Sequence, residues 1–224
     1  RKPAKPIVAI IGGAKVSTKL TIIKKLLEKI DTLILGGGIV NTFLNAAGYE
    51  IGKSLYEKDL VKTSKELIEQ AKKNNCNILL PDDVLTGNKF EENATAEIRS
   101  ISDIDKNDII MDVGPKTIKK LNAIIKEAKT IVWNGPLGVF EFEKFSNGTK
   151  TLAQEIAKSD AYSIAGGGDT IAAITKFNVK KDISYISTGG GAFLEFLEGK
   201  KLPAIGILEE AARAWVAMEK AREL

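Results

Sequence analysis

The sequence contains no histidine, and this absence excludes several classes of chemistry. Ser/His/Asp and Cys/His nucleophilic systems, H-E-x-x-H metalloproteases and metals bound by imidazole all need that side chain. Cysteine is nearly absent as well, because Cys76 is the single cysteine of the 224 residues and has no partner for an internal disulfide bond. A free thiol suits a reducing compartment, so we expect a cytoplasmic protein. Its chemistry must use Lys, Asp, Glu, backbone amides or a metal held by oxygen ligands.

An excess of charge of one sign is also missing. The 33 Lys and Arg residues against 29 Asp and Glu residues give a net charge of +4. Paired lysines are dispersed along the chain, as is typical of the solvated ends of separate helices, so we expect no nucleic-acid partner. No apolar run approaches the ~20 residues of a transmembrane helix, so we expect no membrane partner either. With 44% hydrophobic and 28% charged residues, the composition is that of an ordinary globular protein.

The two ends of the chain differ from its middle. Residues 1–5 are rich in Arg, Lys and Pro, lack the apolar core of a signal peptide and include no initiator Met, so we expect the remnant of a linker or a cut site. Residues 6–208 show no shift in composition and are expected to form one domain. Residues 209–224 are predicted to form a C-terminal helix that docks onto this domain, and we expect the protein to be a monomer.

Short apolar runs alternate with amphipathic stretches along the chain. The apolar runs, which predict strands, cover residues 7–11, 32–35, 77–80, 108–113, 130–133, 161–165 and 184–187. The amphipathic stretches, which predict helices, cover residues 19–30, 58–73, 117–129, 145–158 and 171–177. Continuously apolar strands are typical of a parallel sheet that is buried on both faces. The pattern therefore predicts an α/β fold, a doubly wound and mainly parallel sheet in a Rossmann-like three-layer sandwich, with residues 81–108 as an excursion at its edge.

Glycine is concentrated where these predicted strands end. Eleven of the 20 glycines lie in four clusters, at residues 12–13, 36–38, 166–168 and 189–191. Each cluster follows a predicted strand and precedes a helix, so all four should lie at the carboxyl edge of the sheet, where open α/β folds bind ligands. Helices that begin there direct free N–H groups and a partial positive charge at the same place. The clusters predict a crevice for a nucleotide or a polyphosphate.

The standard nucleotide fingerprints do not match. G-x-G-x-x-G fails after the three glycine triplets, because its third glycine is replaced by Asn41, Ile171 and Leu194. Residues 47–54 come within one residue of a Walker A loop, with Ala47 in place of the first glycine. The preceding residues look helical, whereas a phosphate loop of that type leaves a strand. Neither a dinucleotide-binding domain nor a P-loop is favoured.

The segment Gly-Gly-Ala-Lys-Val-Ser-Thr-Lys at residues 12–19 is the strongest candidate for chemistry. If a helix begins near Lys15, then Lys15 and Lys19 form an i, i+4 pair on one face. Two cations at a glycine turn suit an anion between them, as phosphoryl transfer requires. A solvated lysine pair on a helix surface is the alternative.

Two carboxylates complete the candidate site. Asp169 follows a glycine triplet at a helix start, where backbone N–H groups can hold phosphate oxygens while the carboxylate accepts Mg²⁺. An ordinary N-cap is the competing interpretation of Asp169. Glu141 follows the segment Trp-Asn-Gly-Pro-Leu-Gly and could accept hydrogen bonds from ribose hydroxyls, although it could equally be a plain surface residue.

Several of these segments resemble phosphoglycerate kinase, in the same order and spacing. They are GGAKVSTKL at residues 12–20, GGGI at 36–39, WNGPLGVFEFEKF at 133–145, GGGDT at 166–170 and STGGGAFLEFLEGK at 187–200. The resemblance covers about residues 6–208 and only the C-terminal, nucleotide-binding half of that two-domain enzyme. It implies reversible phosphoryl transfer between 1,3-bisphosphoglycerate and ADP, which gives 3-phosphoglycerate and MgATP. The N-terminal half, which in the family binds the phosphoglycerate, has no counterpart here.

The resemblance also implies a role for each candidate residue. The catalytic positions would be Lys15 and the loop of Gly189, Gly190 and Gly191, which faces the transferred group. Contacts to the nucleotide phosphates would come from Lys19, Asn134, Gly167, Gly168 and Thr170, and Asp169 would hold Mg²⁺. Gly36, Gly37, Gly38, Pro136 and Val139 would wall the adenine slot, with Glu141 on the ribose.

Two departures from the common family pattern concern nucleotide fit. Thr18 occupies a position that is often Asp, and Ile110 with Met111 replaces a frequent Gly-Leu pair beside the adenine. Two alternatives stay open: another ATP-dependent small-molecule kinase on a doubly wound sheet, or a nucleotide-binding module without catalysis. For this chain alone we expect binding of MgADP or MgATP without turnover.

Overall fold

The main sheet of the molecule is parallel and has six strands. The computed structural model describes residues 3–189, and the predicted helix at 209–224 lies outside them. The strands of this sheet are β1 (Ile7–Ile11), β2 (Thr32–Leu35), β3 (Asn77–Leu79), β7 (Thr130–Asn134), β8 (Tyr162–Gly166) and β9 (Tyr185–Ser187). Their order is β3-β2-β1-β7-β8-β9, and every adjacent pair is parallel. The chain builds outward from β1 in one direction and then from β7 in the other, so a topological switch point lies between β1 and β7.

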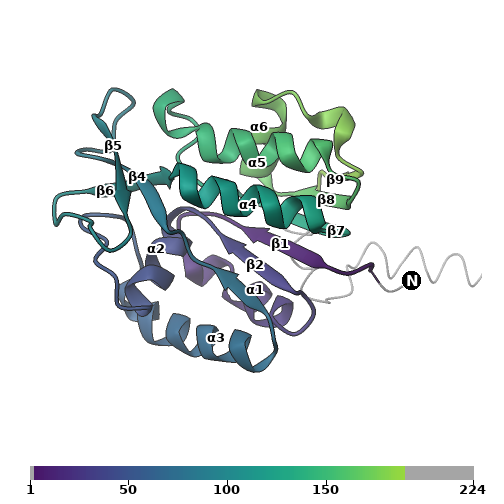
Figure 1. Ribbon diagram of the computed structural model, residues 1–224, viewed down its shortest axis with the longest axis horizontal. Helices are drawn as coiled ribbons and strands as arrows, with labels where there is room; N and C mark the ends of the chain where they lie inside the picture. The colour runs from purple at the N-terminus through teal and green to yellow at the C-terminus, as the bar shows by residue number, and fades with distance from the viewer. Residues whose placement is uncertain (1–2, 190–224) are drawn as a thin grey trace, which may run out of the picture.

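Helices cover both faces of this sheet (Figure 1). One face carries α1 (Leu20–Leu26), α2 (Gly37–Ala46) and α3 (Val61–Lys73), and the other carries α4 (Pro115–Glu127), α5 (Asn147–Lys158) and α6 (Gly168–Lys176). Short 3-10 turns are η1 (Val16–Thr18), η2 (Lys58–Leu60), η3 (Glu143–Phe145) and η4 (Lys180–Asp182).

The side chains of β1 divide between the two layers that these helices form with the sheet. Ala9 and Ile11 pack in the cluster under α1–α3, whereas Val8 and Ile10 pack under α4–α6, as the period of two along a strand requires. All five residues of β1 are buried. The predicted doubly wound α/β sandwich is confirmed.

One predicted strand belongs to a different sheet. The apolar run at 108–113 is a strand, β6 (Ile109–Val113), but it pairs antiparallel with β4 (Asp83–Gly87), whose other neighbour is β5 (Ala96–Ser100). The prediction that this run joins the parallel sheet is therefore wrong. Residues 81–108, expected as an excursion, supply the other two strands of this second sheet. Met111 packs in a separate small cluster with Ala94 and Phe145, and Val113 packs in the core under α4–α6, so β6 has a burial pattern like that of a main-sheet strand.

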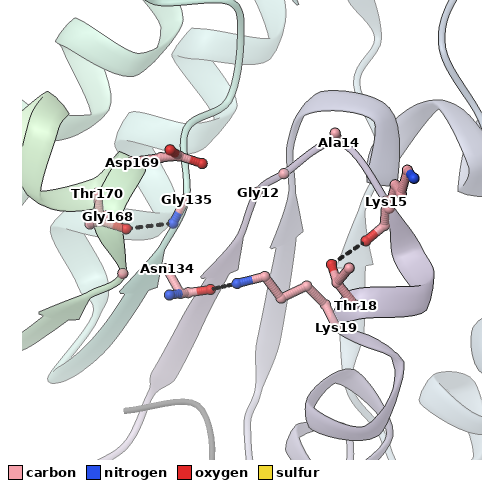
Figure 2. A pocket seen from close by; sticks show the side chains of 12 residues that line it. Gly12, Ala14, Lys15, Thr18, Lys19, Asn134, Gly135, Gly168, Asp169 and Thr170 are labelled. Atoms are coloured by element: carbon pink, nitrogen blue, oxygen red, sulfur yellow. Dashed lines mark hydrogen bonds between the residues drawn. The ribbon is translucent and has the colours of Figure 1, made fainter. Parts of the chain in front are cut away.

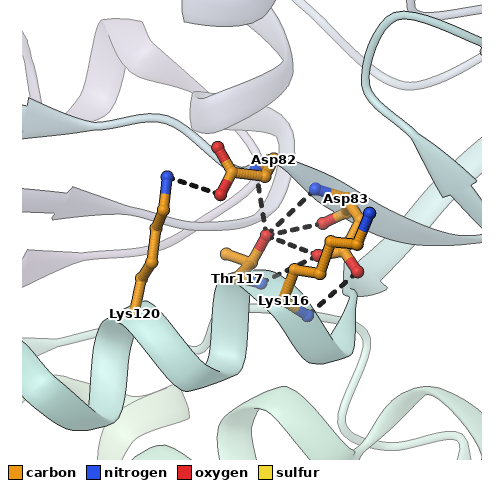
Figure 3. Close-up of polar contacts among 5 residues, drawn as sticks. All are labelled: Asp82, Asp83, Lys116, Thr117 and Lys120. Atoms are coloured by element: carbon orange, nitrogen blue, oxygen red, sulfur yellow. Dashed lines mark hydrogen bonds and ion pairs between the residues drawn. The ribbon is translucent and has the colours of Figure 1, made fainter.

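A buried carboxylate joins the second sheet to α4 (Figure 3). The N-cap residue of α4 is Gly114, which has no side chain to satisfy the free amides of the first turn. Asp83, from β4, accepts hydrogen bonds from the Lys116 N–H at 3.0 Å and the Thr117 N–H at 2.8 Å. The Thr117 hydroxyl lies within 2.8 Å of both the Asp83 carbonyl and the Asp83 carboxylate. Asp83 therefore caps α4 from a distant segment of the chain.

Substitution Asp83→Ala should lower the free energy of unfolding by about 2–4 kcal/mol, because it leaves the amides of the first turn of α4 without acceptors. Asp82→Ala is a matched control: the Asp82 carboxylate is 42% exposed and pairs with Lys120, so its loss should cost less than about 1 kcal/mol. Urea denaturation followed by circular dichroism measures both. Equal losses for the two variants would contradict the capping role.

A second buried carboxylate, Asp112, joins β6 to α5. Its Oδ1 accepts a hydrogen bond from the Val113 N–H at 2.9 Å and its Oδ2 accepts one from the Gly148 N–H at 2.7 Å, in the first turn of α5. Burial raises the pKa of the Asp112 carboxyl to about 7, although both hydrogen bonds oppose the shift. A Cβ at Gly138 or Gly148 would lie 2.3 or 2.2 Å from Oδ1, so glycine is needed at both positions.

The raised pKa of Asp112 predicts a specific dependence of stability on pH. Between the ordinary value of 3.8 and about 7, the folded chain keeps a proton that the unfolded chain has lost, so this carboxyl makes the free energy of unfolding fall as pH rises. Asp112→Asn cannot ionise and should remove this contribution, on the order of 1–4 kcal/mol across the interval. Urea denaturation of both proteins from pH 4 to pH 8 measures the difference. Parallel pH profiles would show that Asp112 does not titrate in this way.

Candidate functional site

Three of the four glycine clusters meet at the carboxyl edge of the main sheet. The Ile39 N–H donates to the Gly13 carbonyl at 3.2 Å, and the Gly37 N–H donates to the Leu137 carbonyl at 2.8 Å. The loops after β1, β2 and β7 are thereby joined, and the triplet after β8 lies beside Asn134. Of the fourth cluster only Gly189 is described, and Gly190 and Gly191 lie outside the described residues. The predicted convergence holds for the first three clusters.

A first cavity of about 230 Å³ opens at the switch point between β1 and β7 (Figure 2). It is lined by residues 12–15, 18, 19, 134, 135 and 167–170. The predicted residues Lys15, Lys19, Asn134, Gly167, Gly168, Asp169 and Thr170 are all among them. Glycine backbone, two lysine residues and a helix start therefore line one small space.

Lys19 is the best-anchored cation of this cavity. Its Nζ donates to Oδ1 of Asn134, and Nδ2 of Asn134 donates to the Gly166 carbonyl at 2.6 Å. Burial lowers the pKa of the Lys19 ammonium, and the charge of Asp169 partly offsets that effect. A cation that has lost part of its hydration gains by meeting an anion in the cavity.

Lys15 and Lys19 do not share a helical face, so that prediction is wrong. Lys15 is extended, with φ −132° and ψ 127°, and precedes η1, whereas α1 begins only at Leu20. The Thr18 hydroxyl donates to the Lys15 carbonyl at 2.8 Å, which closes the short turn between them. The Lys15 and Lys19 side chains extend in different directions from the two ends of this turn (Figure 2).

The start of α6 forms the opposite wall. Gly167, with φ +100°, is the N-cap residue, so Asp169 is not the cap. Among residues 3–189 the Asp169 carboxylate has no hydrogen-bond partner, and its side chain is exposed. The Thr170 hydroxyl is buried; it donates to the Gly166 carbonyl at 2.8 Å and accepts from the Gly135 N–H at 2.7 Å. Thr170 thus fixes the helix start to the loop after β7, while Asp169 stays free to meet a ligand.

A second, more apolar cavity of about 520 Å³ adjoins the first and shares Gly13, Ala14 and Asp169 with it. Its lining includes the predicted Gly37, Gly38, Pro136, Val139 and Glu141, together with Ile110 and Met111. Gly36 does not reach it. A Cβ on Gly36 would lie 2.3 Å from the Pro136 carbonyl oxygen, so Gly36 packs behind the wall rather than on it.

Sequence reasoning missed Leu55, Phe90 and Asp112 in this lining. Phe90 is 60% exposed and its ring centroid lies 5.3 Å from that of Phe142. The only local signal was an aromatic residue within a polar stretch, and Leu55 directly follows the rejected Walker A match at residues 47–54. Only the second sheet and the 47–57 connection bring these side chains to the cavity.

The loop that carries Glu141 is held from α6. Lys176, in the last turn of that helix, donates from Nζ to the Phe140 carbonyl at 2.7 Å. The same Nζ lies 5.9 Å from the centre of the Phe140 ring. Glu141, which lines the second cavity, and Asp169, which lines both cavities, are therefore both attached to α6.

Residues 3–189 offer neither a membrane-spanning helix nor a cluster of metal-binding side chains. Helices there are too short or too polar to cross a bilayer. That same part of the chain holds no group of three or more His, Cys, Asp or Glu side chains arranged for a metal.

Known proteins match this chain closely. A family model described as "Phosphoglycerate kinase" matches residues 1–200. Proteins called "Phosphoglycerate kinase" from Francisella tularensis subsp. novicida (strain U112) and Francisella philomiragia are 55% and 54% identical over 212 residues, which is 95% of this chain and 54% of each relative. The chain therefore spans about half the length of the curated relatives it matches.

Solved structures agree with this match. "Structure of phosphoglycerate kinase from Coxiella burnetii" shares 53% identity at a TM-score of 0.91 and covers 95% of this chain and 55% of that one. The phosphoglycerate kinase of Pyrococcus horikoshii OT3 shares 32% identity at a TM-score of 0.78, over 92% of this chain and 53% of that one. Because sequence, family model and fold all agree, the chain belongs to the phosphoglycerate kinase family.

Proposed function

We propose that this chain is the nucleotide-binding half of a phosphoglycerate kinase, with residues 6–208 as its domain. The observation that carries the proposal is the adjacency of the two cavities, one apolar and one cationic, at the topological switch point. An adenine nucleotide has the same polarity along its length: a flat apolar base, a ribose with hydroxyls and an anionic phosphate chain. Sites of this shape at this place in an open α/β sheet bind nucleotides.

The base would occupy the second cavity. Gly37, Gly38, Pro136 and Val139 offer flat, small walls, and Met111 and Phe90 add apolar surface. Glu141, at the same cavity, would accept hydrogen bonds from the ribose hydroxyls.

The phosphates would occupy the first cavity. Lys19 would supply a partly desolvated charge, and the amides at the start of α6 at Gly167 and Gly168 would supply hydrogen-bond donors. Asn134 would contact phosphate beside Lys19. Thr170 would contribute through its position rather than its hydroxyl, because that hydroxyl is already bonded on both sides.

Mg²⁺ would arrive with the nucleotide and be held by Asp169. Magnesium commonly uses one or two carboxylates together with substrate phosphates and water, so the single free carboxylate of Asp169 fits that ion. When bound, the metal would neutralise charge on the phosphate oxygens.

Transfer of the phosphoryl group would use Lys15 at the mouth of the first cavity, with the loop at 189–191 facing the group. Lys15 would stabilise charge on the phosphoryl oxygens during transfer between 1,3-bisphosphoglycerate and ADP. The phosphoglycerate would be held by the other half of the enzyme. We infer that this chain alone binds nucleotide without turnover and acts in the cytoplasm, as a monomer unless its other half is present.

Isothermal titration calorimetry should show saturable binding of MgATP and MgADP to this chain. Asp169→Asn should weaken MgATP by about tenfold or more, because a metal contact is lost, and should weaken metal-free ATP much less. Asp160→Asn removes the same charge at the amino end of β8, outside both cavities, and should leave both affinities unchanged. A folded chain without saturable heat would refute the nucleotide site. An equal loss of affinity for MgATP and for metal-free ATP in Asp169→Asn would refute the role of Asp169.

Phosphoglycerate kinase turnover should be undetectable for this chain alone, because positioning of the second reactant can contribute ~7 to 11 kcal/mol to such a reaction. Adding the N-terminal half of a family member in trans should restore part of the activity in a coupled assay. Lys15→Ala should lower the restored turnover by several orders of magnitude and leave a small, measurable residual rate. Robust activity of the chain alone, or undiminished rescue with Lys15→Ala, would contradict these assignments.

A further inference from the structure

The segment that carries Lys15 has little internal support. Between β1 and α1 the chain forms one three-residue 3-10 turn, closed by the Lys19 N–H on the Val16 carbonyl at 2.9 Å and by the Thr18 hydroxyl. Such turns have poor hydrogen-bond geometry and seldom stand alone. The side chains of Lys15, Ser17 and Thr18 are exposed. Val16 packs in the core under α1–α3 and anchors the turn, but the exposed residues on either side of it depend on contacts from outside the segment.

Glu57 provides that contact from the connection between α2 and α3. Its Oε2 accepts a hydrogen bond from the Ser17 N–H at 2.8 Å, and its Oε1 accepts one from the Ser17 hydroxyl at 2.6 Å. Both carboxylate oxygens are thus used on a single residue of the turn. Hydrogen bonds to an ionised acceptor are shorter and about twice as strong as neutral ones.

Glu57 is itself attached to the wall of the second cavity. Its N–H donates to the Thr42 hydroxyl oxygen at 3.1 Å, and the buried Thr42 hydroxyl donates to the Gly38 carbonyl at 3.0 Å. Gly38 lies in the first turn of α2 and lines the second cavity. A continuous series of hydrogen bonds therefore runs from that wall through Thr42 and Glu57 to Ser17.

The charge of Glu57 acts on the same turn. Burial alone would raise the pKa of the Glu57 carboxyl, but hydrogen bonds from Ser17 and Val16 and the charge of Lys15 outweigh burial and lower the pKa. The group is therefore ionised at neutral pH and attracts the Lys15 ammonium. Within residues 3–189, Glu57 is absent from the lining of both cavities, so a ligand there would not touch it.

We propose that Glu57 is a positioning residue for Lys15. Its carboxylate clamps Ser17 and so sets the place of the Lys15 ammonium at the mouth of the first cavity. The inference rests on the proposed function, in which Lys15 acts on the phosphoryl group in transit. A positioning residue of this kind affects the chemical step more than the binding of nucleotide.

The first test uses the chain alone. Glu57→Gln keeps the size of the side chain but loses the charge and one acceptor, so the Ser17 amide should lose protection against hydrogen exchange, measured by NMR. Glu50→Gln is the matched control, because Glu50 accepts hydrogen bonds from the Ile51 and Gly52 amides, both at 3.0 Å, in a different turn. Unchanged exchange at Ser17 in Glu57→Gln would overturn the clamp.

The second test uses the chain assembled with the family's N-terminal half. Glu57→Gln should lower kcat by up to about a hundredfold, while the KM for MgATP changes little. Ser17→Ala, which keeps the amide contact to Glu57, should cause a smaller loss, and Glu50→Gln none. In the Lys15→Ala background, Glu57→Gln should cause no further loss, because both substitutions remove the same action.

The outcomes separate this inference from the proposed function. If the assembly shows no turnover, or if Lys15→Ala leaves its turnover unchanged, the proposed function is overturned and this inference with it. Turnover that is lost in Lys15→Ala but retained in Glu57→Gln would overturn the inference alone. A raised KM with unchanged kcat in Glu57→Gln, or losses that add in the double variant, would also overturn it.

Discussion

The backbone of Gly12 lies directly against the loop that follows β7, and the site depends on this close approach. The Gly12 N–H donates to the Asn134 carbonyl at 2.8 Å, which extends the β1–β7 pairing beyond the strand ends. A Cβ on Gly12 would lie 1.9 Å from the Pro136 carbonyl oxygen, and one on Gly135 would lie 2.3 Å from the Gly12 carbonyl oxygen. Any side chain at either position would separate the two loops. Because these loops line both cavities, that separation would open the two cavities together.

A second set of contacts joins the three elements that meet at this edge. Lys19, from the loop after β1, donates a hydrogen bond to the Asn134 side chain. The Asn134 side chain in turn donates to the carbonyl of Gly166 at the end of β8, and the Thr170 hydroxyl of α6 accepts from the Gly135 N–H. Asn134 is 1% exposed, and its amide oxygen and nitrogen are both hydrogen-bonded. A buried amide with satisfied hydrogen bonds has one favourable orientation, so it fixes where the Lys19 ammonium points. The charge in the first cavity is thus placed by neutral groups.

The sequence was most informative where the signal is local. Apolar runs and glycine clusters are contiguous, so the six main-sheet strands and the crevice at their carboxyl edge could be predicted. The apolar run of β6 could not be assigned to its sheet, because Met111 is buried in a small cluster and Val113 in the main core, so the run is as apolar as a main-sheet strand. The helix expected to begin at Lys15 is replaced by an extended Lys15 and a short 3-10 turn at Val16–Thr18, because the residues that follow Lys15 give no signal for one kind of turn over the other. Contacts between distant segments, such as Glu57 with Ser17 or Asp83 with Thr117, have no local signature.

Helix α6 mechanically links Asp169 to the loop that carries Glu141. Asp169 lies in its first turn and Lys176, which holds the Glu141 loop, in its last, so a rod of about 13 Å joins the two ends. A helix this short resists bending, because its backbone hydrogen bonds stiffen it along its whole length. A tilt or slide of α6 must therefore displace Asp169 and the Glu141 loop together. The distance between Asp169 and the loop that carries Glu141 is consequently set by one rigid element.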